Sequence, residues 1–143
     1  LSSSSAASDV YKRQILASIE ANKLGYDEGI MNDLNGNIST CNSTNLFFIK
    51  DNEVFTSKGE YCLNGITRSK AIKICNENGI KCHEVNFTYD TIKDCDEAFV
   101  TGTFAGIIPV SKLENRKLKS IHSDSLVNHI RLLYNNHIQK EIS

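Results

Sequence analysis

The hydrophobic pattern of this 143-residue chain changes its period near residues 63–68, and that change limits its fold class. Before it, short aromatic and β-branched runs such as Asn45–Lys50 are bounded by turn residues, which is typical of strands. After it, apolar residues recur at helical spacing until Asn78-Gly79 ends the pattern. After a helix end predicted at Ile15–Leu24, a hairpin-rich part is followed by strands that alternate with helices, which predicts an α/β (mixed α+β) protein.

The same signals predict the remaining elements. Asn35-Gly36 is a strong hairpin signal, and Asp51-Asn52 predicts a second turn. The expected strands are Tyr26–Asp33, Ile38–Thr40, Asn45–Lys50, Glu53–Thr56, Lys81–Phe87, Glu97–Thr103 and Gly106–Leu113. Thr88–Asp94 predicts a short helical turn. A last helix, capped by Ser123 or Asp124, is expected to bury one apolar stripe: Leu126, Val127, Ile130, Leu133, Tyr134 and Ile138.

Composition narrows the classes of function. The chain is 40% hydrophobic with a formal net charge of -1, so one packed domain is expected, without the basic surplus that favours nucleic acid or anionic membranes. No apolar run is long enough to span a bilayer. Five cysteines without a Cys-x-x-Cys pair predict reduced thiols of a cytoplasmic protein rather than a metal site or a disulfide framework.

Residues 1–14, LSSSSAASDVYKRQ, differ in composition from the rest of the chain. They lack the apolar stretch of a signal peptide. We therefore divide the chain into a segment foreign to the domain, residues 1–14, and one domain, residues 15–143.

Two short segments are candidates for an anion site. Gly65-Ile66-Thr67-Arg68 stands at a predicted helix start, where free N–H groups and the helix dipole favour phosphate. Thr101–Gly106 follows a hydrophobic strand with small and hydroxyl residues, so backbone amides can approach a ligand closely. Each has a plainer interpretation: a threonine helix cap and a tight turn. Together they suggest a site for a phosphorylated ligand.

These segments, taken with their neighbours, resemble the class IV aminotransferases of the branched-chain and D-amino-acid type. The resemblance runs from about Ile15 to Ser120. In order, it rests on Ile-Glu-Ala-Asn, Gly-Tyr-Asp-Glu-Gly, Thr-Asn-Leu-Phe-Phe, Leu-Asn-Gly-Ile-Thr-Arg, Asp-Glu-Ala-Phe-Val-Thr-Gly-Thr and Ile-Pro-Val. It implies the larger, C-terminal domain of that fold, pyridoxal 5'-phosphate as cofactor, and a homodimer when the protein is full length.

The resemblance also implies roles for residues of this chain. The phosphate would be held by the Gly65 turn, with the amides of Ile66 and Thr67 and the Thr67 hydroxyl, and by Thr103, for which Gly102 leaves room. Leu63 would pack on the pyridine ring, and Thr40 would stand near its nitrogen. The amides of Thr103, Phe104 and Ala105 would receive the substrate carboxylate.

The sequence departs from the family pattern at functional positions. The lysine that forms the Schiff base would align with Ala6, so the chain as given is expected not to transaminate. Thr40 replaces a glutamate that would hold a charge beside the pyridine nitrogen. Gly106 stands where branched-chain enzymes often have glutamate, and Phe104 is bulkier than the usual alanine.

Several functions fit this resemblance. We expect the parent enzyme to transfer an amino group between a branched-chain or related amino acid and 2-oxoglutarate, with the cofactor as electron sink. A D-amino-acid aminotransferase and an aminodeoxychorismate lyase share the fold and remain alternatives. From a different class, a chain without the lysine also fits a non-catalytic phosphate-binding module.

Overall fold

The computed structural model describes residues 30–32, 38–41, 45–58, 65–102, 106–113 and 116–142. Its central sheet has five strands in the order β5-β4-β3-β6-β7, and β4–β5 is the parallel pair. These strands are β3 (Asn45–Lys50), β4 (Glu53–Thr56), β5 (Cys82–Glu84), β6 (Glu97–Gly102) and β7 (Gly106–Pro109). Two small antiparallel pairs flank the sheet: β1 (Ile30–Asn32) with β2 (Ile38–Cys41), and β8 (Lys112–Leu113) with β9 (Arg116–Lys117).

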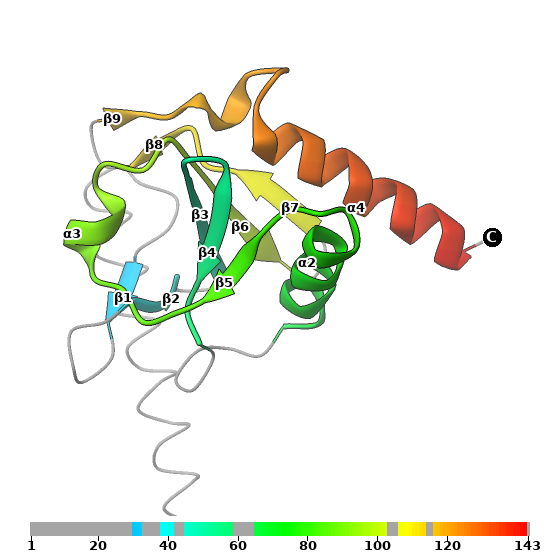
Figure 1. The fold of residues 1–143 in the computed structure, drawn as a ribbon, viewed down its shortest axis with the longest axis horizontal. Coiled ribbons are helices and arrows are strands. Elements are labelled where there is room, and N and C mark those ends of the chain that lie inside the picture. The colour runs from blue at the N-terminus through cyan, green and yellow to red at the C-terminus, as the bar shows by residue number, and fades with distance from the viewer. Residues whose placement is uncertain are drawn as a thin grey trace, which may run out of the picture.

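Helices and small strands cover both faces of the sheet (Figure 1). The helices are α2 (Ile66–Glu77), α3 (Tyr89–Ile92) and α4 (Leu126–Ile142), with a 3-10 turn, η1, at Lys119–Ile121. Figure 1 shows α2 and α4 on one side, while α3, β1 and β2 lie on the other. The mixed α and β class predicted from the sequence is therefore confirmed.

Burial on both faces explains the nearly continuous apolar strands β3 and β6. Alternate side chains of a strand point to opposite faces. In β3, Phe47 and Ile49 pack with α2 and α4, whereas Leu46 and Phe48 pack on the face toward α3. The rings of Phe47 and Phe99 stack across β3 and β6 with centroids 4.6 Å apart. A strand buried on both sides needs apolar residues at successive positions.

Two turns follow directly from residue type. Asp51 and Asn52 connect β3 to β4 with φ of 53° and 62°, the left-handed pair that suits a two-residue hairpin. Helix α2 ends at Gly79, whose φ is 71°, and the Ile80 amide donates to the Cys75 carbonyl at 2.9 Å. This is the bonding pattern of a glycine C-terminal cap. The sequence predicted both turns.

Several predicted boundaries differ from the structure. Strand β5 is shorter than the predicted Lys81–Phe87, and the predicted strand Gly106–Leu113 divides into β7 and β8. The cap of α4 was also predicted wrongly, because Ser125 provides it: its hydroxyl accepts from the Asn128 amide at 3.0 Å. Several serines and an aspartate compete at this helix start, and contacts with the sheet decide between them. The Asn35-Gly36 turn lies outside the described residues, although β1 and β2 pair antiparallel on either side of it.

Gly106 opens β7 in a backbone conformation that favours glycine, with a φ of 68°. A Cβ atom there would lie 2.9 Å from Cε1 of Tyr134 on α4. We expect Gly106→Ala to lower the free energy of unfolding by about 2 kcal/mol, through backbone strain and steric overlap. Urea denaturation measures this loss. In a Gly106→Ala/Tyr134→Leu double variant, the leucine should relieve the steric overlap but not the backbone strain. A Gly106→Ala variant as stable as the wild type would contradict the prediction.

Within the part of the chain that the structure describes, no helix combines the length and apolar character needed to cross a membrane.

Candidate phosphate site at the start of helix α2

Four strands bring polar residues to one end of the sheet. The register pairs Asn45, which begins β3, with Thr101 near the end of β6. It also pairs Thr56, the last residue of β4, with Glu84, the last residue of β5. Helix α2 begins beside these residues, since a Cβ atom on Gly65 would lie 3.2 Å from Asn45 Nδ2. The first of the predicted anion segments thus lies at the polar end of the sheet.

The start of α2 has the properties of an anion site. Gly65 precedes the helix in an extended conformation, with φ of -94° and ψ of 141°, and no side chain caps the helix. The first turn has no acidic residue. Amides of a first helical turn lack carbonyl partners within the helix, so those of Ile66 and Thr67 can serve a ligand. Ile66 itself is 77% exposed, which leaves this helix start accessible among the described residues.

The two predicted anion segments meet through one hydrogen bond. The buried Thr67 hydroxyl donates to the Gly102 carbonyl at 3.2 Å, although the two residues are 35 positions apart in the chain. The structure therefore places the helix start beside the last residue of β6. A hydroxyl has one proton, so in this arrangement an anion would receive backbone N–H donors rather than the Thr67 O–H.

Arg68 is part of this cluster, and its involvement was not predicted. It is only 5% exposed, and its Nη2 donates to the Ser57 carbonyl at 2.6 Å and to Glu84 Oε1 at 2.9 Å. Its Nε has no hydrogen-bond partner among the described atoms. An arginine early in a helix is usually a solvated side chain, so the sequence alone offered only its place in the Gly-Ile-Thr-Arg motif as a signal.

Thr101, the first residue of the second predicted segment, adds a further polar group near the helix start. Its side chain is 2% exposed, and its Oγ1 lacks a partner within the described structure. Asn45, directly across from it, is also buried. The extent of polar burial here was not visible in the sequence, because it depends on the register between β3 and β6.

The remaining predicted site residues are only partly placed. Thr40 lies in β2, where it pairs with Met31, and its side chain lies outside the described structure. Leu63, Thr103, Phe104 and Ala105 fall outside the described residues, although Thr103 directly follows Gly102 in the chain. Their roles remain predictions.

The opposite end of the sheet presents a different set of polar groups. An open depression there is lined by Asn52, Glu97, Ser125 and His129 among others. One of its carboxylates, Glu97, accepts from the amides of Leu126 and Val127 and so caps α4. This depression lies at the far ends of β3 and β6 from Gly65, and Glu97 already has a structural role.

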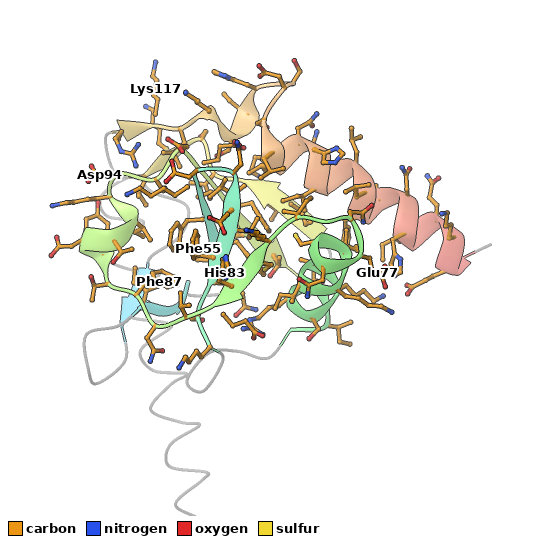
Figure 2. All side chains as sticks on the ribbon, viewed as in Figure 1. Phe55, Glu77, His83, Phe87, Asp94 and Lys117 are labelled. Atoms are coloured by element: carbon orange, nitrogen blue, oxygen red, sulfur yellow. The ribbon has the colours of Figure 1, made fainter. Side chains whose placement is uncertain are left out.

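Two histidines of the described residues, His83 and His137, have acidic partners. His83 Nε2 lies 2.9 Å from Glu53 Oε1, and that hydrogen bond lowers the pKa of Glu53. The His83 ring stacks on Phe55 with centroids 5.0 Å apart, and Figure 2 shows the two rings side by side. On α4, His137 lies 3.1 Å from Glu141. These contacts give His83 and His137 a structural role.

The thiols are free within the described residues, namely Cys75, Cys82 and Cys95. A hydrogen bond with Cys82, together with burial, raises the pKa of Cys75, and burial raises the pKa of Cys95. The raised pKa values make Cys75 and Cys95 unreactive, whereas the hydrogen bond with Cys75 lowers the pKa of Cys82. Among the residues that the structure describes, no group of three or more histidine, cysteine or acidic side chains could hold a metal ion.

Solved structures similar to this one include aminotransferases. An aminotransferase from Brucella abortus, bound to the cofactor PLP, matches 89% of this chain and 45% of its own, with a TM-score of 0.82 and 29% identity. The branched-chain amino acid aminotransferase of Escherichia coli matches 88% of this chain and 43% of its own, with a TM-score of 0.81 and 33% identity. The fold is thus that of the fold-type IV aminotransferases.

Sequence comparison defines the family. The model of the family "Amino-transferase class IV" matches residues 6–113, so the chain belongs to the class IV aminotransferases. A branched-chain-amino-acid aminotransferase of Pseudomonas aeruginosa is 38% identical over 108 residues, which cover 76% of this chain and 35% of that relative. The branched-chain-amino-acid aminotransferase of Escherichia coli (strain K12) is 39% identical over 105 residues, which cover 73% of this chain and 34% of that relative. The chain therefore spans about a third of the length of these relatives.

Proposed function

We propose that this chain forms the cofactor-binding domain of an enzyme that transfers amino groups between branched-chain or related amino acids and 2-oxoglutarate, with pyridoxal 5'-phosphate as cofactor. The observation that carries the proposal is the Thr67–Gly102 hydrogen bond, which brings the two candidate phosphate segments together. The names of the relatives support the substrate class. Another branched-chain amino acid aminotransferase of the same fold, 31% identical, was solved with N-(5'-phosphopyridoxyl)-L-glutamate.

The residues present fit a phosphorylated cofactor. The uncapped helix start, with no acid in its first turn, suits a phosphate, and Gly65 keeps that approach free of a side chain. In this proposal the amides of Ile66 and Thr67 bind the phosphate, together with Thr103 beyond Gly102. Leu63 packs on the ring and Thr40 stands near its nitrogen.

The residues of this chain bind the cofactor and orient the substrate. When bound, the cofactor supplies an electron sink for the bond that breaks at the substrate α-carbon. The amides of Thr103, Phe104 and Ala105 receive the substrate carboxylate and so hold the α-carbon in place. Thr40 gives one hydrogen bond without charge, so it supports a protonated ring nitrogen less than glutamate would. We assign no residue of this chain to the proton transfer, for which the family uses a lysine.

The whole enzyme is proposed to be a cytoplasmic homodimer, in keeping with the family resemblance. Its amino-group transfer is tested with the full-length protein, leucine and 2-oxoglutarate, by following glutamate formation. Glutamate formed from L-leucine is the expected result. Formation only with D-amino acids would instead indicate the D-amino-acid enzyme, and no transfer with either series would overturn the proposal.

The phosphate site is tested by removing one backbone donor. Proline is tolerated at the first position of a helix, and the extended Gly65 suits a residue that precedes proline. Ile66→Pro should therefore keep the fold but lose one N–H group, and weaken pyridoxal 5'-phosphate binding about tenfold. Ile66→Ala is the matched control, because it also removes the exposed side chain but keeps the amide. Equal affinity in the two variants, measured by isothermal titration, would contradict the assignment.

A further inference from the structure

We propose that Arg68 is a positioning residue for the cofactor phosphate: its buried guanidinium fixes the first turn of α2 against the ends of β4 and β5 and adds positive charge there. The inference rests on the proposed function, since it deepens the role of the same site. Arg68 directly follows Thr67 and is only two residues from Ile66, so any shift at Arg68 moves the proposed donor amides as well.

The hydrogen bonds of Arg68 connect the start of α2 to two strands of the sheet. One guanidinium nitrogen, Nη2, reaches both the Ser57 carbonyl after β4 and the Glu84 carboxylate at the end of β5. Thr67 meanwhile holds the same turn to Gly102 at the end of β6. The first turn of α2 is thereby held at three strand ends, which is the rigid support that a preformed binding site requires.

The charge of Arg68 opposes the normal preference of a helix start. The N-terminal turn of a helix carries partial positive charge, and acidic side chains are favoured there. In α2 the first turn has no acidic residue, and its third residue is a buried arginine. The Glu84 partner has a side chain that is 46% exposed, so solvent weakens its compensation. A cation placed against the dipole is a local conflict of the kind found at functional sites.

A bound anion would resolve this conflict. Arg68 Nε is buried and has no partner among the described atoms, so the guanidinium is not fully compensated by the protein residues described. A phosphate at the helix start would face both the helix dipole and this fixed charge. In this proposal the charge of Arg68 contributes to phosphate affinity in addition to holding the first turn of α2.

The test compares two ligands that differ only in the phosphate. Binding of pyridoxal 5'-phosphate and of pyridoxal to the full-length protein is measured by isothermal titration, and the ratio of the two affinities reports the phosphate contribution. Arg68→Met should reduce this ratio about tenfold while pyridoxal affinity stays within about twofold. Arg68→Lys keeps the charge but not the planar fork, and should reduce the ratio about threefold.

Arg116→Met is the matched control. Arg116 also donates from a guanidinium to a backbone carbonyl, that of Cys95 at 2.8 Å, but on β9, away from α2. This variant should lose some stability and keep the ratio of the wild type. An unchanged ratio in Arg68→Met, or in Arg68→Lys if the methionine variant does not fold, would overturn the positioning role. A wild-type protein that binds the two ligands equally would instead overturn the proposed function, and this inference with it.

Discussion

Replacing Phe99 with alanine should lower the free energy of unfolding by about 4 kcal/mol, which is among the largest effects expected for a core substitution in the described residues. Phe99 is completely buried in β6, the strand between β3 and β7. Its ring stacks on Phe47 with an angle of 10° between the ring planes. The truncation removes a large apolar side chain, leaves a cavity between sheet and helices, and ends the aromatic contact.

Urea denaturation of wild type and variant measures this loss. Leu132→Ala is the matched control, because Leu132 is a large apolar residue of α4 that is 52% exposed. The control should change stability by less than about 1 kcal/mol. A Phe99→Ala variant that loses no more than the Leu132→Ala control would show that this side chain is not in the core.

Replacing Glu97 with alanine should cost about 3 kcal/mol, because the substitution removes a charged cap from the longest described helix. The Glu97 side chain accepts from the Val127 amide at 2.9 Å and from the Leu126 amide at 3.2 Å. The residue is 8% exposed, so water replaces these bonds poorly in the variant. Helix α4 would lose both of these hydrogen bonds to the first residue of β6.

Circular dichroism during urea denaturation measures the loss of helix and the change in stability together. Glu97→Gln keeps one acceptor oxygen and no charge, so it should cost about half as much as the alanine variant. Ser125→Ala removes the neighbouring hydroxyl cap and should cost about 1 kcal/mol. If Glu97→Ala costs less than Ser125→Ala, the carboxylate is not the main cap of α4.

Much of the fold could be predicted because its signals are local. The turn residues Asp51 and Asn52 adopt the left-handed conformation that their types favour, and Gly79 ends α2 as expected. The apolar runs of β3 and β6 have the length and composition of strands buried on both faces. These outcomes depend on neighbours within a few positions in the chain.

Predictions that depended on distant partners were less accurate. The predicted cap of α4 was Ser123 or Asp124, but Ser125 lies where the helix meets Glu97, 28 residues earlier in the chain. The strand predicted over Gly106–Leu113 breaks after Pro109: Val110 still donates to the Ala98 carbonyl of β6, but the Ala98 amide donates to the distant Ser120 hydroxyl instead. Contacts with residues distant in the chain decide where these elements begin and end, and the propensity of their own residues does not.

The candidate site shows the same difference between local signals and contacts between distant residues. The sequence by itself determined which segments suit an anion, because glycine, a hydroxyl and a helix start have those properties wherever they lie. Only the tertiary structure decided that Thr67 meets Gly102, and that Arg68 is buried between Ser57 and Glu84. The physical reason is that the cost of burying a charge depends on which partners the fold brings to it, and sheet register sets those partners.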